Sequence, residues 1–407
     1  MQSDWKKDIT LFIISQNISL FGSALVQYAI MWYVVLETES GVMMTVYIIA
    51  GFLPTFFISP FAGVWADRFS RKLLIILADS GIAFFTLLLA ILFIIGYKEI
   101  WLLFAAAAIR AAGGGIHTPA IGAILPQIVP SEKLTRVNGV NTTIVSIVYL
   151  LAPMLSATLL SIASLEFIFF IDVVTASSAV SILIFFLHIP VHSKSTEKKN
   201  VSYFSDLREG AVYIRNHNYV RNFFIFFAIF YFLAAPVAYL TPLQVTRTFG
   251  NDIWRLTAVE VVFSLGMAAG GGIMASWQGL KNKVYTMILS IFGFGIFTFA
   301  LGVIPNFWIY LFFMSLVGIA LPVFSTPSTV LLQQKVEEEF LGRVFGVYGM
   351  ISSSMMPLGM LIFGPIADTI QIEWLLIGTG VLFTVEGFFM IANKELIKAG
   401  EPVSKPA

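Results

Sequence analysis

Ionisable side chains occur inside stretches of this sequence that are otherwise almost wholly apolar. Arg110, Asp172, Glu260 and Glu386 each lie in such a stretch. An ionised side chain at the centre of a membrane-spanning helix costs about 2.5–3.5 kcal/mol on insertion scales, so it usually faces the interior of a helix bundle. There a carboxylate can take up and release a proton, and an arginine can hold a carboxylate. The residue types therefore predict charge-handling chemistry within a membrane.

The acids are not equivalent. Glu260 shares one helical face with Ser264 and Gly271, and we take it as the first candidate for a proton-linked carboxylate. The alternative is a glutamate near the outer end of its span, where water hydrates it. Asp172 and Glu386 are expected to be structural partners of other groups, and Asp172 is the next candidate for proton coupling.

The one cation within a span belongs to a second pattern. Arg110, Gly114 and His117 are four and three residues apart, which places them on one helical face. Arg110 either takes part in function or is a structural tie to a carbonyl or carboxylate. His117 either lines a substrate cavity or is solvated near the end of its span. Asp79, just inside another apolar run, is expected to join the basic residues at 71–72.

Polar stripes at helical spacing run along two further apolar segments, at residues 16–27 and 138–153. Such stripes line a cavity or join helices by hydrogen bonds of about 0.6 kcal/mol each, and the pattern leaves both readings open. We place five residues in a substrate cavity: Gln16, Gln27, His117, Tyr149 and Tyr231.

Composition defines the class of protein that must position these residues. Hydrophobic residues make up 58% of 407 and charged residues 12%, whereas soluble chains carry roughly a quarter charged residues. Without cysteine there is no disulfide, thiol catalysis or cysteine-bound zinc. No phosphate-binding glycine loop, metal-ligand spacing or basic nucleic-acid patch occurs. We therefore expect no enzymatic activity, no cofactor and no nucleic-acid partner, and ATP-driven transport is disfavoured.

Each span needs about 20 apolar residues, and the sequence predicts an all-α membrane protein of twelve transmembrane helices. The runs lie at 9–36, 42–66, 73–96, 100–127, 138–162, 165–190, 220–246, 254–278, 284–304, 306–333, 343–368 and 372–392. We expect a six-helix bundle over 1–190, a linker over 191–219 with a short amphipathic helix from Phe204 to Arg215, a second bundle over 220–393, and a tail over 394–407.

The distribution of lysine and arginine predicts the orientation. Of the 24 such residues, only Lys98, Arg247 and Arg255 fall in the connections from odd to even spans, apart from Arg110 within a span. Positive residues collect on the cytoplasmic side. Both termini are thus expected to be cytoplasmic, in a protein of the inner (plasma) membrane.

An internal repeat indicates two similar halves. Thr118-Pro119 is followed by Leu134-Thr-Arg136, and Thr326-Pro327 is followed by Leu341-Gly-Arg343. Duplicated halves with a site between them are a transporter architecture.

The segment between the second and third spans reads Gly63-Val-Trp-Ala-Asp67-Arg68-Phe-Ser-Arg71-Lys72. It resembles the signature loop of the major facilitator superfamily, although Ser70 stands where that family usually has glycine. The resemblance implies two pseudo-symmetric six-helix bundles and a cytoplasmic gate motif of Gly63, Asp67, Arg68, Arg71 and Lys72, in which Asp67 and Arg68 form a latch.

Other motifs point to one branch of that superfamily. Arg110 with the glycines after it is similar to a drug–proton antiporter signature, with Gly113 in place of the usual glutamine, and Ala152-Pro153 replaces a Gly-Pro pair. Over nearly the whole chain the sequence resembles the macrolide-efflux branch, in stretches such as Gly51-Phe-Leu-Pro54 and His117-Thr-Pro-Ala120. The resemblance implies proton-coupled export of hydrophobic or amphipathic drugs such as macrolides. We also expect the protein to be a monomer.

Two other functions stay open. One is a facilitator that exports a native metabolite, siderophore or lysophospholipid, or that takes a solute up. The other is a membrane receptor or scaffold that transports nothing. The expected partners are a small amphipathic substrate, protons and the lipid bilayer.

Overall fold

The computed structural model describes residues 5–130, 133–187 and 203–401. Every regular element in these ranges is a helix, and twelve helical segments are long and apolar enough to cross a membrane. The predicted all-α membrane class and the twelve spans are confirmed. Several helices begin a few residues earlier than the apolar runs, because polar residues such as Lys6, Lys7 and Asp8 belong to the first turns.

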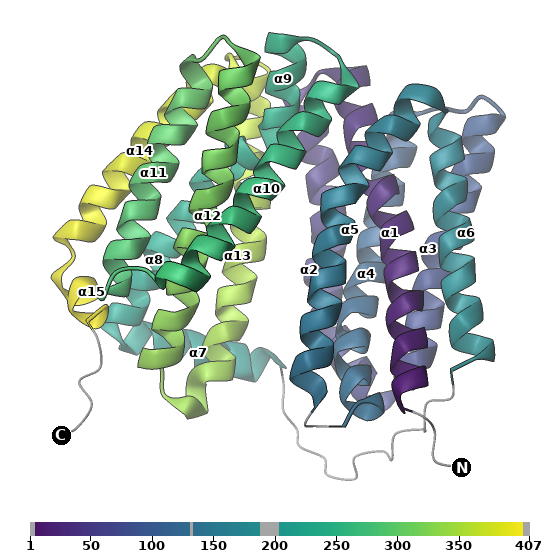
Figure 1. Cartoon of the computed structure of the whole chain (residues 1–407), viewed down its shortest axis with the longest axis horizontal. Coiled ribbons are helices and arrows are strands. Elements are labelled where there is room, and N and C mark those ends of the chain that lie inside the picture. The colour runs from purple at the N-terminus through teal and green to yellow at the C-terminus, as the bar shows by residue number, and fades with distance from the viewer. Residues whose placement is uncertain (1–4, 131–132, 188–202, 402–407) are drawn as a thin grey trace. The chain divides into compact units, whose positions relative to one another are not determined.

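The chain divides into two compact units. Unit 1 comprises Met1–Thr38 and Val46–Lys199. Within it α1 packs against α4, α5 and α6, and α3 packs against α4 and α6 (Figure 1). Its helices are α1 (Trp5–Thr38), most of α2 (Gly41–Arg68), α3 (Arg71–Ile94), α4 (Ile100–Ile128), α5 (Leu134–Ile162) and α6 (Leu165–Phe185).

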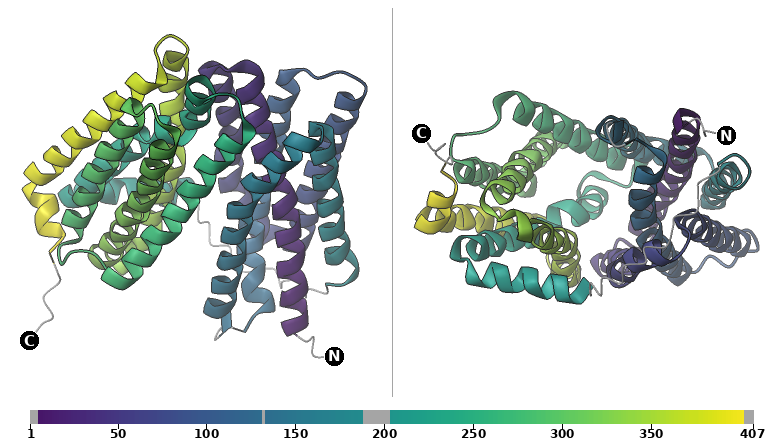
Figure 2. Two further views of the ribbon diagram at one scale, coloured as in Figure 1. Left: turned by 45° about the horizontal axis from the view of Figure 1, so that its top comes forward. Right: turned by 90° about the horizontal axis from the view of Figure 1, so that it is seen from below.

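Unit 2 comprises Glu39–Thr45, at the start of α2, and Asn200–Ala407. Seen from below in Figure 2, its spans form a bundle of their own. Its remaining helices are α7 (Tyr203–Asn216), α8 (Asn218–Leu233), a π-helical segment (Pro236–Leu240), α9 (Thr241–Phe249), α10 (Ile253–Trp277), α11 (Lys283–Val303), α12 (Phe307–Lys335), α13 (Glu338–Ala367), α14 (Ile372–Ala392) and α15 (Lys394–Ala399).

The two units repeat the same pairing of spans. In unit 1 the third span packs on the fourth and sixth, and in unit 2 α11, the ninth span, packs on α12 and α14. The first span contacts the fifth and sixth, and α8 in the seventh span contacts α13 and α14. Both copies of the Thr-Pro repeat lie in the fourth span of their unit, α4 and α12. The sequence repeat therefore corresponds to a structural repeat.

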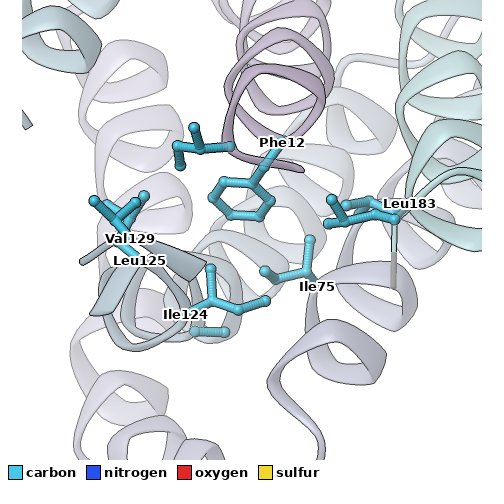
Figure 3. Packing of buried hydrophobic residues seen from close by; sticks show 9 residues of the cluster. Phe12, Ile75, Ile124, Leu125, Val129 and Leu183 are labelled. Atoms are coloured by element: carbon cyan, nitrogen blue, oxygen red, sulfur yellow. The ribbon is translucent and has the colours of Figure 1, made fainter. Parts of the chain in front are cut away.

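Apolar side chains from four helices of unit 1 form a core cluster. Phe12 of α1, Ile75 of α3, Ile124 of α4 and Leu183 of α6 are each at most 1% exposed (Figure 3). In a bilayer the helices gain little from the hydrophobic effect, so close van der Waals packing of this kind holds them together.

Polar side chains cap several helices. Ser70 accepts a hydrogen bond from Leu73 N at the start of α3, and Asn306 accepts from Trp308 N at the start of α12. Caps of this type satisfy backbone N–H groups that the first turn leaves unpaired. Serine at position 70, where the resembling family has glycine, therefore serves as the cap of α3.

The seventh span is one continuous helical run over Asn218–Phe249, as the sequence predicts, but it contains a π-helical turn. α8 ends at Leu233, a π-helical turn covers Pro236–Leu240, and α9 resumes at Thr241. Pro236 and Pro242 lack a backbone N–H, so neither can donate the helical hydrogen bond. In α9, Gln244 Nε2 donates to Leu301 O at 3.0 Å, and Gln244 Oε1 accepts from the Tyr310 hydroxyl at 2.8 Å.

α7 forms where the amphipathic helix is predicted and packs against α13. Tyr213 stacks on Phe340 with ring centroids 4.7 Å apart, and Glu209 pairs with Arg343 at 3.1 Å. The side chains of 203–207 lie outside the described residues, and with them the first half of the predicted apolar face. The described half of that face includes Ala211, which is exposed.

Candidate functional site

The intramembrane cation of unit 1 is paired. Arg110 Nη1 donates to Asp172 Oδ2 at 2.5 Å and to Thr86 Oγ1 at 3.0 Å, and Nη2 donates to Ser23 O at 3.0 Å. Ser23 Oγ donates to Asp172 Oδ1 at 3.2 Å. The Asp172 side chain is fully buried and that of Arg110 is 12% exposed. The network joins α1, α3, α4 and α6. Of the two interpretations of Arg110 that the sequence allows, the structure shows the structural tie to a carboxylate. Asp172 is the partner in that tie.

A second ionisable pair lies about two turns further along the same face of α4. His117 Nε2 on α4 is 3.2 Å from Asp79 Oδ1 on α3, and their side chains are 19% and 5% exposed. Asp79 is expected beside Arg71 and Lys72 but is eight residues along α3 from Arg71, about 12 Å. Its ion pair among the described residues is instead with His117.

Asp79 is incompletely satisfied. Its Oδ2 is buried and has no hydrogen-bond partner in the described part of the chain, and the contact to His117 Nε2 lacks hydrogen-bond geometry. An ionised carboxylate in such surroundings is costly unless a cation or donor compensates it. Asp79 is therefore a buried carboxylate with one oxygen unpaired among the described residues.

Both pairs border one cavity of about 300 Å³ inside unit 1. Its wall contains polar groups from five helices set among apolar side chains. The polar contributors include Ser19, Ser23 and Gln27 of α1, Tyr47 and Thr55 of α2, Asp79 of α3, Arg110 and His117 of α4, and Tyr149 of α5.

Three of the five predicted cavity residues, Gln27, His117 and Tyr149, line this cavity. Gln16 does not: it is 6% exposed and its Nε2 lies 3.3 Å from Ser15 Oγ within the helix packing. Tyr231 belongs to unit 2, where its ring lies against Phe227 at a centroid distance of 4.8 Å. The stripe on α1 is thus divided, with Gln27 in the cavity and Gln16 in a helix contact.

Glu260 lies on a face of α10 that the other helices of unit 2 leave uncovered. It is half-buried, and Met267 and Gly271 on the same face are exposed. The neighbouring face, with Gly266 and Gly270, meets the backbone of α12 so closely that a side chain there would collide with Ser315 O or Ile319 O. No ion pair of Glu260 occurs within the described ranges.

Glu386 on α14 has no structural partner among the described residues, contrary to expectation. It is 4% exposed, and neither carboxylate oxygen has a hydrogen-bond partner. It borders an apolar pocket of about 500 Å³ between α8 and α14, beside Leu233 and Phe389.

The structure describes the side chains of only two members of the cytoplasmic gate motif, Arg71 and Lys72. The side chains of Gly63, Asp67 and Arg68 lie outside the described residues. Arg71 donates to Ala66 O at 3.0 Å and Ala123 O at 2.5 Å, and Lys72 donates to Leu187 O at 2.7 Å. These bonds connect the start of α3 to the ends of α2, α4 and α6. The roles of Arg71 and Lys72 in gating stay predictions.

Sequence reasoning missed Asp368, which follows α13. Its carboxylate accepts from Gly41 N at 2.6 Å, Val42 N at 2.9 Å, Ser40 Oγ at 2.7 Å and Arg247 Nη2 at 2.9 Å. Burial alone would raise the pKa of Asp368, but these hydrogen bonds outweigh burial and hold the pKa below its ordinary value. The missed signal is Gly364-Pro-Ile-Ala-Asp368, which repeats the Gly-x-x-Ala-Asp pattern of Gly63 to Asp67.

The model of the Major Facilitator Superfamily matches residues 9–360. Macrolide efflux protein A of Streptococcus pyogenes is 30% identical over 384 residues, which cover 93% of this chain and 95% of that protein. The chain therefore belongs to the major facilitator superfamily. It is a multi-pass membrane transporter, and the expectation that it is not an enzyme is confirmed.

More distant similarities agree with this assignment. The staphyloferrin A transporter of Staphylococcus aureus is 25% identical over 411 residues, covering 97% of this chain and 98% of that protein. A solved structure of the nucleoside transporter NupG superposes with a TM-score of 0.73 at 15% identity, covering 96% of this chain and 99% of that one. The D-xylose-proton symporter gives 0.69 at 12% identity, covering 97% and 99%. These two structures support the fold alone.

Proposed function

We propose that this transporter exports hydrophobic or amphipathic drugs such as macrolides in exchange for protons. The observation that carries the proposal is the cavity of unit 1, in which the ionisable pair Asp79–His117 lies among apolar helices. Ionisable residues inside membrane-spanning helices usually face the bundle interior and mark substrate pathways or proton relays. The similarity to a macrolide efflux protein supports the substrate class.

The proposal has a definite orientation. The protein lies in the plasma membrane as a monomer, with both termini in the cytoplasm. The bias of lysine and arginine supports the placement of the termini. Asp67 and Arg68 latch the cytoplasmic gate. Glu260, on the uncovered face of α10, is the carboxylate that couples the proton gradient to accumulation.

Drug susceptibility tests the proposal. In a host that lacks its own efflux pumps, expression should raise the inhibitory concentrations of erythromycin and ethidium above those of an empty vector. Dissipating the proton gradient should increase the drug retained by the cells. If susceptibility to both drugs and to tetracycline is unchanged while the protein is present in the membrane, drug export is refuted.

A second candidate is transport of a siderophore, favoured by the 25% identity to the staphyloferrin A transporter over nearly the full length. Siderophore transport would require a site for an anionic, metal-chelating molecule. Arg110 is the cation that borders the cavity, and it is engaged by Asp172. Competition between siderophore and ethidium for binding to the purified protein would distinguish the two candidates.

A further inference from the structure

We propose that a groove between the first turns of α1 and α5 in unit 1 binds an acidic phospholipid, with the phosphate of the headgroup on three basic side chains and an acyl chain along an apolar wall. Such a site is independent of the proposed drug export.

The groove lies where α1 and α5 begin, at the same end of unit 1 (Figure 1). It has a volume of about 500 Å³ and is lined by side chains from residues 5–13 and 133–140. The membrane-spanning segments begin at Trp5 and Arg136, so the groove is level with the headgroups and the upper acyl chains of one leaflet. In the proposed orientation this is the cytoplasmic leaflet.

The charged side chains of the groove are all basic. Lys6, Lys133 and Arg136 are exposed in its wall, and no acidic residue lines it within the described ranges. Asp8 also belongs to α1, but two residues along a helix turn its side chain by about 200° from that of Lys6. An anion that enters the groove therefore meets three positive charges.

The two basic side chains at the start of α5 are uncompensated. Lys133 and Arg136 make no side-chain hydrogen bond or ion pair in the described part of the chain. At the start of α3, by contrast, Arg71 and Lys72 donate to backbone carbonyls. The charges of Lys133 and Arg136 are therefore available to a ligand.

The rest of the wall is largely apolar. Trp5 and Val137 are partly buried against the core cluster of Figure 3, and Ile9 belongs to that cluster. Val140 is 48% exposed. A small anion would leave this wall uncovered, whereas an acyl chain covers it. Basic pockets between spans on the cytoplasmic side favour acidic headgroups, and tryptophan is enriched at the same depth.

Other occupants fit the groove less well. A cationic drug would be repelled by the three basic side chains, so the groove is not a second drug site. The linker over 188–202 is the longest stretch outside the described residues, and it carries three lysines and one glutamate. Its net charge therefore has the same sign as the groove, which favours a lipid over the chain's own linker.

Because the protein has no native cysteine, one fluorophore can report on the groove. Attached to Thr10→Cys it lies in the wall, and attached to Ile14→Cys it lies on α1 outside the wall, at a side chain that is 46% exposed. The full-length protein is reconstituted in phosphatidylcholine vesicles with a small share of nitroxide-labelled phosphatidylglycerol or, in parallel, of phosphatidylcholine with the same label.

Nitroxide quenching then measures which lipid occupies the groove. At position 10 phosphatidylglycerol should be preferred about fivefold or more, because each basic residue near the membrane surface contributes about that factor. At position 14 the two lipids should quench equally. Raising the salt concentration should weaken the preference at position 10, since exposed charges are screened.

Charge variants identify the residues that recognise the lipid. Lys133→Gln/Arg136→Gln should lose most of the preference at position 10. Lys394→Gln/Lys398→Gln is the matched control, because it removes the same charge from exposed positions of α15 in unit 2, and it should keep the preference. An excess of inorganic phosphate should not displace the lipid.

Three results would refute the lipid site: equal quenching by both lipids at position 10, an undiminished preference in Lys133→Gln/Arg136→Gln, or displacement of the lipid by inorganic phosphate. The last would show that the groove holds a small anion and not an acyl chain. Drug susceptibility is measured separately, so failure of the lipid site leaves drug export standing, and failure of drug export leaves the lipid site standing.

Discussion

The guanidinium of Arg110 on α4 meets the carboxylate of Asp172 on α6 at 2.5 Å, with Asp172 fully buried. Ser23 of α1 contacts both members, through its carbonyl and its hydroxyl. Two charges in the apolar interior are tolerated because each is hydrogen-bonded to the other and to a third helix. The pair therefore holds α1, α4 and α6 of unit 1 in register.

Removing one member of this pair should destabilise unit 1. Asp172→Leu leaves the Arg110 charge buried without a counter-charge, at a cost of about 3–5 kcal/mol. We expect a clearly lowered Tm of the detergent-solubilised protein. The double variant Arg110→Met/Asp172→Leu should regain most of the loss. A Tm equal to wild type in Asp172→Leu would show that the pair contributes little.

The Asp368 cluster should make stability depend on pH. Because hydrogen bonds hold the folded-state pKa of Asp368 below its unfolded value, its contribution is complete above about pH 4–5 and is lost as the pH falls through the folded-state pKa. Asp368→Ala should therefore cost about 0.5–2 kcal/mol at pH 7, and the difference from wild type should shrink below about pH 4. Thermal unfolding between pH 3 and 7 measures this.

Asp252→Ala is the matched control for that measurement. Asp252 also precedes a helix, but its side chain is 56% exposed and makes only a 3.4 Å pair with Arg255. Such surface pairs contribute about 0–1 kcal/mol. An Asp368→Ala variant that loses no more stability than Asp252→Ala, or loses it equally at all pH values, would contradict the assignment.

Glu386 should be dispensable for stability. Its carboxyl group is buried with both oxygens unpaired, and a polar group buried without partners costs free energy. We expect Glu386→Leu to match or exceed the Tm of wild type in detergent, with Leu382→Ala, on the same helix, as a packing control. A large loss of Tm in Glu386→Leu would indicate that the carboxyl has a stabilising partner.

The gate proposal leads to a transport prediction. Asp67→Asn should slow drug export in vesicles while membrane insertion stays normal, because the latch loses its anion. Ser70→Gly, which restores the residue usual in the family and removes only a cap, should affect the rate less. Equal rates for Asp67→Asn and wild type would remove Asp67 from the mechanism.

The spans could be predicted from sequence because length and apolarity alone decide which segments cross a bilayer. Partners of buried charges could not. Arg110 and Asp172 are 62 residues apart, and nothing local distinguishes that carboxylate from Glu260 or Glu386. Asp79 is close in sequence to Arg71, so the sequence predicts Arg71 as its neighbour. That prediction is wrong, because the packing of α3 against α4 brings Asp79 to His117.

The role of Asp368 was hidden for a different reason. Its partners, Gly41 and Val42, lie more than 300 residues earlier in the chain. Only the repeated Gly-x-x-Ala-Asp pattern links it to Asp67, and a pattern does not identify the helix start that the carboxylate contacts.

Glu260→Gln should abolish accumulation driven by a pH gradient but retain downhill exchange, because only the titratable proton is lost. Both assays are run on the same vesicles, and accumulation against the gradient by Glu260→Gln would remove Glu260 as the coupling residue.

Accumulation in inside-out vesicles is the decisive test of proton-coupled drug export. Vesicles with an acidic lumen should accumulate ethidium or radiolabelled erythromycin above the external concentration, and an ionophore that collapses the pH gradient should release it. An alkaline lumen should give no accumulation. Drug uptake that is the same with either gradient, or with none, would rule out coupling to protons.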